Sequence, residues 1–406
     1  MNKETTEGLL KALKSYIKTC KAEDLYDAQK AINDFNEQWK TIENHYVDKN
    51  TNYGEALLQY SIAIWTASNK SEKQVQHLAN LIYEYDENKN AKYDPYYCKD
   101  LFYSLGLCWH QLGKLYDIKV IEAFKNYLFH LFSQRNPFIF TTVTPIIAYS
   151  FRKCSKYLYQ ALINDELNLS APSTFNDPFD CPIVDLLKSG NDLSSLMYQA
   201  FQGSLKIACF SNNKKLPYFS DSINSATNPV FGEKKHNNDR TEYLNELMWA
   251  HYADYHRGIC IKYKFCLEST PRERKIVSFF RDVEYSNDKL AQYPSLEKMP
   301  LEDAFFLKGK AWEHENELRF LYYDVNGKGE HGSISTPGCI EAIYFGLKCP
   351  KEEKNTILNI IKDKNSNKNP RYENIKFFQI QIDKEHLGQL KAVPFQETDG
   401  NTPPKQ

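Results

Sequence analysis

The segment Lys308–Tyr323, KGKAWEHENELRFLYY, joins regularly spaced carboxylates to an apolar run. Glu313, Glu315 and Glu317 occupy every second position, and Arg319 follows at the same interval. If the segment is a strand, Glu315, Glu317 and Arg319 share one face and the apolar side chains between them share the other. Enzymes use two carboxylates about 7 Å apart beside a cation to give the two carboxyl groups different pKa values. Surface strands also carry alternating charge without a chemical role, so both interpretations stay open.

The composition is that of an ordinary globular protein. The chain has 406 residues, of which 42% are hydrophobic and 25% charged, and this predicts two or three domains with ample core. Its formal net charge of −1 does not indicate nucleic acid as a partner, although a local basic patch is compatible with that total. No run approaches 18 apolar residues and the first residues form no apolar leader, so we expect a cytoplasmic protein without a membrane partner.

The cysteines and glycines carry no short binding motif. The ten cysteines are scattered and form no CxxC pair, which predicts reduced thiols packed as small apolar groups. The 16 glycines form no phosphate-binding loop. We therefore expect no metal site.

Residues 1–135 show helical spacing almost throughout. Apolar residues between Ala28 and Tyr46 recur at intervals of three and four, which draws one stripe along a helix. Turn-rich breaks separate six such segments, so the sequence predicts an all-α array of helical hairpins. The expected helices cover residues 9–17, 28–46, 57–65, 75–85, 97–112 and 118–132.

One expected pair of helices contains the string LFYSLGLCWHQLG at 101–113 and continues to Tyr116. This pair resembles a tetratricopeptide repeat. The resemblance places Gly106 where two helices approach closely, and Trp109 and Phe124 where they interlock. Arrays of this kind bind a partner chain or peptide, so a protein partner is expected here. A structural cap on the next domain is the alternative.

Around Asn136–Thr144 the helical spacing gives way to β-branched and aromatic alternation, which places a domain boundary there. Short strands and helices follow without a repeated βαβ unit, so residues 136–396 are predicted to form a mixed α+β domain. Residues 397–406 are predicted to be a disordered tail. Strands are expected at 146–152, 167–171, 206–210, 258–265, 277–285, 318–323, 340–345 and 377–383, and helices at 155–165, 193–205, 242–252, 301–308 and 351–363.

Several segments of this domain carry long, specific strings. FNDPFD begins at Phe175 and MWAHY begins at Met248. Together with IACFS, KAWEHENELRF and IEAIYFG, in this order, they resemble the bacterial domain of unknown function 2971 family. The resemblance covers about residues 146–395. It implies membership but no activity, because the function of that family is not known.

Three polar positions at expected strand ends form a second pattern. Arg152 ends the first strand of the domain, Ser211 ends IACFS, and Glu315-Asn-Glu317 leads into a later strand. This order resembles ADP-ribosyltransferases of the arginine–serine–glutamate type. The resemblance implies NAD as a substrate, and either transfer of ADP-ribose or cleavage of NAD.

The resemblance also implies a role for each of these residues. Loss of nicotinamide leaves an oxocarbenium-like ribosyl cation, which the Glu317 carboxylate would stabilise. Glu315 would orient or deprotonate the acceptor, and Ser211 would order the hydrogen bonds on the nicotinamide side. Arg152 would hold the diphosphate through its planar guanidinium.

Other candidate binding residues each have an ordinary structural explanation. Trp249 and Tyr252 offer flat faces for stacking on a ring, but a tryptophan on a helix commonly packs in the core. His251 is a candidate base or simply a packed histidine. Arg257 suits a phosphate or a carboxylate at the surface.

Asn176 and Asp177 precede a proline, so they are first of all expected to form a turn, which can also contact a ligand.

Two other functions stay open. The same domain is compatible with a non-enzymatic module that holds a nucleotide or peptide while the helical array recruits a partner. His251 and Asp254 with Glu315 are compatible with a metal-dependent nuclease, although no zinc-type spacing supports it. The two-domain architecture is typical of bacterial conflict systems such as antiphage defence.

Overall fold

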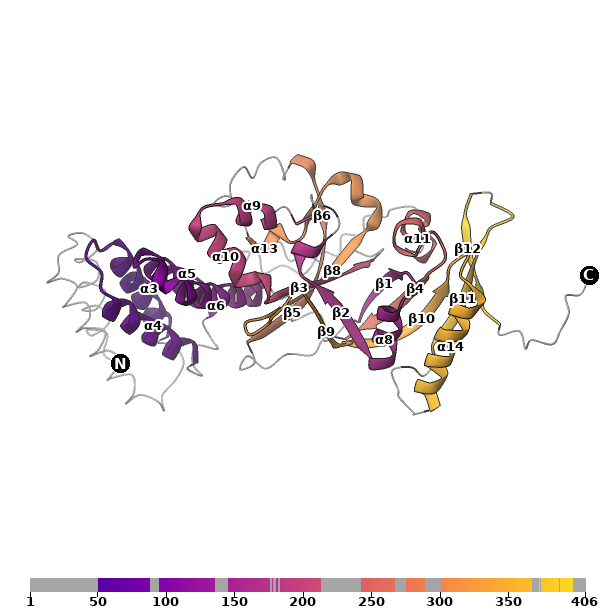
Figure 1. Ribbon diagram of the computed structural model, residues 1–406, viewed down its shortest axis with the longest axis horizontal. Helices are drawn as coiled ribbons and strands as arrows, with labels where there is room; N and C mark the ends of the chain where they lie inside the picture. Colours follow the sequence, from indigo (N-terminus) through magenta and orange to yellow (C-terminus); the bar gives the residue numbers. More distant parts are fainter. Residues whose placement is uncertain are drawn as a thin grey trace, which may run out of the picture.

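The computed structural model describes residues 50–87, 95–135, 145–175, 177, 180–181, 183–212, 242–266, 275–288, 301–366, 372, 374–386 and 388–396. Helices form one end of an elongated molecule, and a curved mixed sheet with its own helices forms the rest (Figure 1). This arrangement confirms the predicted α+β class. The helices expected at 9–17 and 28–46, the boundary at 136–144 and the tail at 397–406 lie outside the described residues.

In the described part of the chain, four helices form the helical layer: α3 (Asn50–Thr66), α4 (Glu72–Glu87), α5 (Pro95–Gln111) and α6 (Asp117–Arg135). A short 3-10 turn, η2 (Lys114–Tyr116), connects α5 to α6 after Gly113, whose φ of 104° suits glycine. Gly106 of α5 lies directly against the ring of Phe124 on α6. The two helices therefore approach closely at the point the sequence predicts, while membership of the tetratricopeptide family stays a prediction.

Strands from distant parts of the chain form one large sheet in the order β12-β11-β10-β4-β1-β3-β2-β9, with β8 paired to both β3 and β5. In the described part of this sheet β10 and β11 are parallel and the other pairs are antiparallel. The strands are β1 (Ile146–Arg152), β2 (Glu166–Ser170), β3 (Leu205–Ser211), β4 (Ile259–Phe265), β5 (Ile276–Asp282), β8 (Glu317–Asp324), β9 (His331–Ser335), β10 (Gly338–Phe345), β11 (Lys376–Ile382) and β12 (Leu390–Pro394). A separate parallel pair joins β6 (Glu284–Tyr285) to β7 (Leu307–Lys308).

Helices cover both faces of the sheet. One face packs against α8 (Lys156–Asn164) and α14 (Lys351–Ser366), where side chains of both helices share an apolar cluster with β1, β4 and β10. The opposite face is covered over β3, β5 and β8 by α6 and α10 (Asp192–Gln202), and over β1 and β4 by α11 (Glu246–Tyr252). The shorter helical segments are η3 (Pro172–Thr174), α9 (Ile183–Ser189), η4 (Glu242–Leu244), α13 (Leu301–Ala304) and η7 (Lys310–Glu315). Among the described helices, none combines the length and apolar character needed to cross a membrane.

The helical layer packs directly on the sheet. The ring centroid of Phe132 on α6 lies 5.4 Å from the ring centroid of Tyr323 on β8 and 6.4 Å from that of Phe279 on β5. The Tyr323 hydroxyl donates to the carbonyl of Lys125 at 3.0 Å. One apolar cluster thus runs from the helices into the sheet.

The structure differs from the sequence-based expectation around 301–316. The helix expected at 301–308 covers only Leu301–Ala304, because Leu307 and Lys308 pair as a strand with β6. The strand expected at 318–323 is β8, which begins at Glu317, whereas Glu315, which the strand interpretation placed on one face with Glu317, belongs to the 3-10 segment η7. The elements α9, β9 and β12 were not predicted. No residue of these two five-residue strands is fully buried and α9 is only seven residues long, so their apolar patterns are weak.

We expect Gly106→Ala to destabilise the protein by about 1–3 kcal/mol, because the new methyl group would overlap the ring of Phe124. This outcome opposes the usual gain when alanine replaces glycine inside a helix. Urea denaturation would measure it. Gly309→Ala is the control, since its methyl group would meet only Asn287 Oδ1 at 3.7 Å. A Gly106→Ala protein as stable as the wild type would contradict the close approach of α5 and α6.

Candidate functional site

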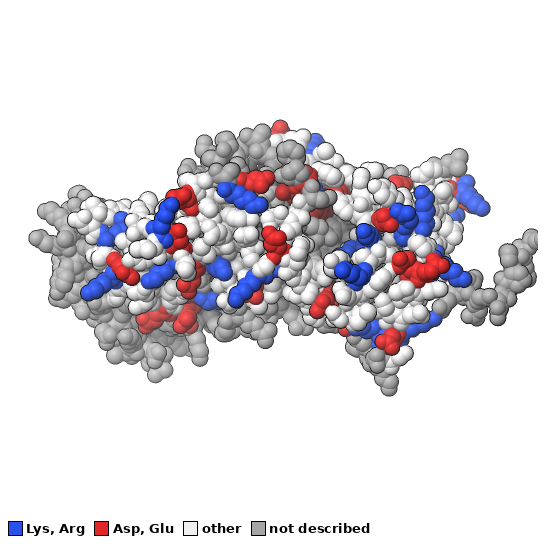
Figure 2. Space-filling view, viewed as in Figure 1, with Lys and Arg blue, Asp and Glu red and all other residues white. Residues whose placement is uncertain are grey.

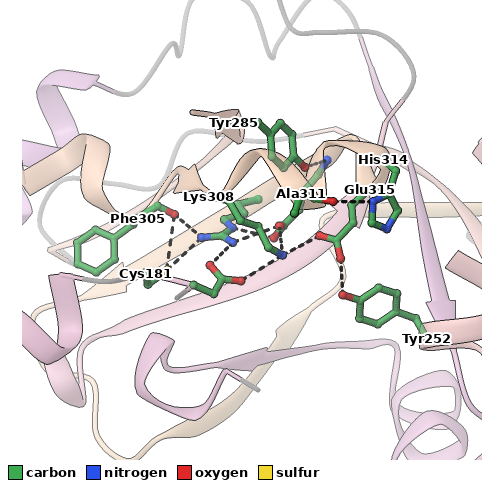
Figure 3. Close-up of polar contacts among 11 residues, drawn as sticks. Cys181, Tyr252, Tyr285, Phe305, Lys308, Ala311, His314 and Glu315 are labelled. Atoms are coloured by element: carbon green, nitrogen blue, oxygen red, sulfur yellow. Dashed lines mark hydrogen bonds and ion pairs between the residues drawn. The ribbon is translucent and has the colours of Figure 1, made fainter. Parts of the chain in front are cut away.

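A buried ammonium group lies at the centre of the candidate site. Lys308 Nζ is 2.7 Å from Glu315 Oε2, 3.1 Å from Glu317 Oε2 and 3.3 Å from Asp180 Oδ2 (Figure 3). All four side chains are at most 7% exposed. One cation therefore holds three carboxylates inside the protein, and we call this set, together with Arg319, the charged network.

Arg319 supplies the second cation and has no exposed surface. Its Nε lies 2.7 Å from Glu317 Oε1 and its Nη2 lies 2.6 Å from Asp180 Oδ1. Its Nη1 donates to the carbonyl of Phe305 at 2.6 Å and contacts Cys181 Sγ at 3.1 Å. Asp180 and Glu317 thus bridge the two cations, which satisfies most of the hydrogen-bonding capacity of the guanidinium.

The local backbone explains how Glu315 and Glu317 reach the same ammonium. The 3-10 segment η7 ends at Glu315, and Asn316 has a left-handed conformation with φ 43° before β8 begins. Asparagine tolerates this conformation better than most residues. The Tyr252 hydroxyl of α11 donates to Glu315, and the backbone N–H of Glu317 donates to the Tyr285 hydroxyl at 2.8 Å.

The charges of the network control its protonation. Burial alone would raise the pKa of Glu317, but Arg319 and Lys308 together hold that pKa at about 2. The pKa of Lys308 is raised, because Glu317, Asp180 and Glu315 outweigh the effect of burial. By formal charge, three carboxylates face two cations, so the network carries one excess negative charge.

Two residues of β3 lie beside the network on the same face of the sheet. The β3–β8 register pairs Ser211 with Glu317 and Cys209 with Arg319. Ser211 is 1% exposed, and its hydroxyl has no hydrogen-bond partner within the described part of the chain. Solvent reaches the sheet at Cys209, although the surrounding protein and Glu317 raise the pKa of its thiol.

The strand β3 changes its pairing partner near Cys209. On the side of β3 away from β8, the pairing changes from β2 at Ile207 to β1 at Ser211. Cys209 lies between these two contacts. Cys209 is therefore beside a change of strand partner and opposite Arg319 of the charged network.

A further buried acid contacts this site through Asn316. Asn316 Nδ2 donates to Glu242 Oε1 at 2.9 Å, and Glu242 is 5% exposed. Burial raises the pKa of Glu242 to about 7, and the hydrogen bond from Asn316 offsets part of that rise. Nearby, Asn245 Nδ2 donates to the carbonyl of His314 at 2.8 Å, which ties the start of α11 to η7.

Of the residues expected to form the site, Glu315, Glu317, Ser211 and Tyr252 lie together, and Arg152 does not join them. Tyr149 and Phe151 of β1 pack on the face that α11 covers, so Arg152 points to the opposite face. There it lines a separate cavity that α8 and Tyr372 also border. The diphosphate role implied for Arg152 therefore has no support from its position relative to Glu317.

The other expected ligand contacts have structural roles. Trp249 is fully buried, stacks edge-on to Phe151 at 5.3 Å, and donates through its indole N–H to the carbonyl of Tyr243. Arg257 pairs with Asp254 at 3.1 Å on the surface. His251 is an exposed residue of α11.

The FNDPFD string contributes Asp180, a residue that the sequence analysis did not single out. Asn176 lies outside the described residues. The carbonyl of Asp177 accepts from the N–H of Asp180 at 3.0 Å, and this turn directs the Asp180 carboxylate to Lys308 and Arg319. Asp180, Lys308 and Cys209 were all missed as site residues. The one signal in the sequence for any of these three residues was that Asp180 is the acid at the end of the FNDPFD string.

The described side chains that could together bind a metal ion lie outside the charged network. Within the described ranges, two sets of His, Cys, Asp or Glu side chains are close enough to hold an ion, namely Asp86 with Cys98 and His130, and Asp383 with Glu385 and His386. Neither set includes His251, Asp254 or Glu315, so the geometry gives no support to the nuclease alternative.

Comparisons with known proteins give one match. Residues 248–320 match a family described as a protein of unknown function (DUF2971). The matched segment contains Tyr252, Lys308, Glu315, Glu317 and Arg319. No curated protein and no solved structure matches the chain.

We expect Lys308→Met to destabilise the fold by about 3–5 kcal/mol, because it leaves three buried carboxylates with Arg319 as their one remaining cation in the network. Urea denaturation near neutral pH would measure the loss. Lys310→Met is the matched control, since Lys310 is exposed on the same turn and its substitution should change stability by less than about 0.5 kcal/mol. Equal stability of the two variants would show that the ammonium is not the centre of the network.

We expect Glu242→Gln to change how stability depends on pH. The unfolded chain loses this proton near pH 4.5 and the folded chain keeps it to about 7, so wild-type stability falls as pH rises through that window. The contribution is at most about 3 kcal/mol. Glutamine cannot ionise. In urea denaturation, the free energy of unfolding of the variant should therefore rise relative to that of the wild type between about pH 5 and about pH 8. A constant difference between the two proteins would rule out a raised pKa at Glu242.

Proposed function

We propose that the sheet domain binds NAD beside Ser211 and Glu317 and breaks the bond between nicotinamide and ribose. ADP-ribose then passes to water or to another acceptor. The observation that most supports this proposal is the Ser211 hydroxyl. It is buried, it is paired in register with Glu317, and no described residue hydrogen-bonds to it.

The excess negative charge of the network suits this chemistry. When the C1′–N bond breaks, its electron pair leaves with nicotinamide and positive charge develops on the ribose. A buried carboxylate at the site lowers the energy of that cation, because the surrounding protein screens the interaction poorly. Glu317 is the group closest to Ser211 in the β-ladder, and its low pKa keeps it ionised.

The remaining roles follow from position. Ser211 has one hydroxyl proton to donate to the carboxamide or ribose of the substrate. The acceptor oxygen forms the new bond to C1′ and loses its proton to Glu315, which Lys308 and Tyr252 hold in place. The proposal gives no role to Arg152, since that side chain is on the other face of the sheet.

One observation favours a second candidate, a non-enzymatic nucleotide-binding module. Glu317 and Asp180 each contact both cations of the network. A carboxylate held by two cations stabilises a third positive charge less effectively than a free one does. In that case Ser211 and Cys209 contact a bound nucleotide that is not cleaved.

The sharpest test compares two buried serines. Ser211→Ala should be at least as stable as the wild type, because the hydroxyl has no partner among the described residues, and should lower nicotinamide release from NAD about 10²-fold. Ser204→Ala is the matched control. Ser204 is equally buried and donates to the carbonyl of Val325, so this variant should lose some stability and keep its activity.

Release of nicotinamide by the full-length chain would be followed together with NAD binding by calorimetry. Glu317→Gln, which keeps the shape and removes the charge, should also lose release. Equal release by Ser211→Ala and the wild type would place the reaction elsewhere. Binding of NAD that Ser211→Ala abolishes, without any release by the wild type, would establish the binding module instead. Neither binding nor release would reject both functions.

A further inference from the structure

Three buried side chains of the helical layer bring together ligand atoms of three kinds. Asp86 lies at the end of α4, Cys98 in the first turn of α5, and His130 on α6. Their carboxylate oxygen, sulfur and imidazole nitrogen all lie within 4.8 Å of one another. Thiolate, imidazole and carboxylate are the ligands that zinc takes in proteins, with neighbouring ligand atoms about 3–4 Å apart around the ion.

A second set of contacts orients the Asp86 carboxylate. Lys275 Nζ lies 3.2 Å from Asp86 Oδ2 and donates to Asn126 Oδ1 at 2.8 Å. The other oxygen of Asp86, Oδ1, lies 2.9 Å from His130 Nε2. One oxygen is therefore held by the lysine, while the other is directed toward the imidazole. Ligating carboxylates in metal sites commonly have such an outer partner.

Packing fixes the His130 ring as well. Phe102 stacks on it at 5.5 Å with an interplanar angle of 10°, and Phe129 meets it edge-on at 5.0 Å. His130 and Cys98 are each 1% exposed. A ring clamped in this way presents Nε2 to the cluster without a rotamer change.

We propose that Asp86, Cys98 and His130 bind one zinc ion, with water as the fourth ligand. Binding displaces the thiol proton of Cys98 to solvent, and the imidazole binds in its neutral form. The ion joins α4, α5 and α6, and Lys275, which directly precedes β5, connects it to the sheet. The sequence gives no sign of this site, because its ligands come from three helices instead of one short motif.

The competing explanation is a cluster of ion pairs in which His130 and Lys275 neutralise Asp86. Both groups lower the pKa of Asp86 to about 2 against the opposing effect of burial. That explanation requires no thiol at position 98, so Cys98 distinguishes the two.

The test measures zinc in the full-length protein, purified without chelators and then equilibrated with zinc. We expect about one zinc per chain in the wild type and less than about a tenth of that in Cys98→Ala and His130→Ala. Cys108→Ala is the matched control, because Cys108 is an equally buried thiol of α5 outside the cluster. It should retain the wild-type zinc content.

Cobalt in place of zinc provides a second readout, because a thiolate band in the wild-type spectrum reports a cysteine ligand directly. The wild-type protein should show thiolate-to-cobalt charge-transfer absorption, and Cys98→Ser should lose it while Cys108→Ser keeps it. A wild type that binds no zinc, or one whose cobalt spectrum lacks the thiolate band, would overturn the proposal. Full zinc binding by Cys98→Ala would do the same.

Discussion

The ammonium group of Lys308 holds three carboxylates, which come from the distant turn at Asp180, the end of η7 and the start of β8. Burying an ion pair is unfavourable unless its geometry is good and its remaining hydrogen bonds are made. The strand β7, the segment η7, the start of β8 and the turn at Asp180 therefore have to be in place together. This requirement explains why a two-residue strand and a six-residue 3-10 segment are part of this fold.

The sequence predicted part of this site for a reason that was only half correct. Alternation along a strand correctly placed Glu317 and Arg319 on one face. Alternation also placed Glu315 on that face. Glu315 does lie beside Glu317, but the cause is the left-handed backbone of Asn316, which connects the 3-10 segment η7 to the strand β8. Both backbones bring the carboxylates together, so the pattern of charges alone cannot distinguish them.

Other parts of the site were beyond the reach of local patterns. Asp180 and Lys308 lie far apart in the sequence, and no periodicity relates them. Arg152 was expected near Glu317 because both lie at strand ends, but helices cover both faces of β1. Its apolar residues then point to both sides, so the sequence carries no signal of which face Arg152 takes. The helices α3 to α6 were predicted well because their apolar stripes are long, whereas β9 and β12 are short and contain no fully buried residue.

The residues that stabilise this site and those that would act in it are partly different. Lys308 and Arg319 form ion pairs with Glu317. Substitution of Glu317 can therefore reduce function by disturbing the structure as well as by removing a reactive group. Ser211 is the opposite case, because no described residue forms a hydrogen bond with its buried hydroxyl. A buried polar group without a partner costs about 1–3 kcal/mol. Among the described residues the Ser211 hydroxyl has no such partner, and it lies in register with Glu317, so the ligand that we propose would complete its hydrogen bond.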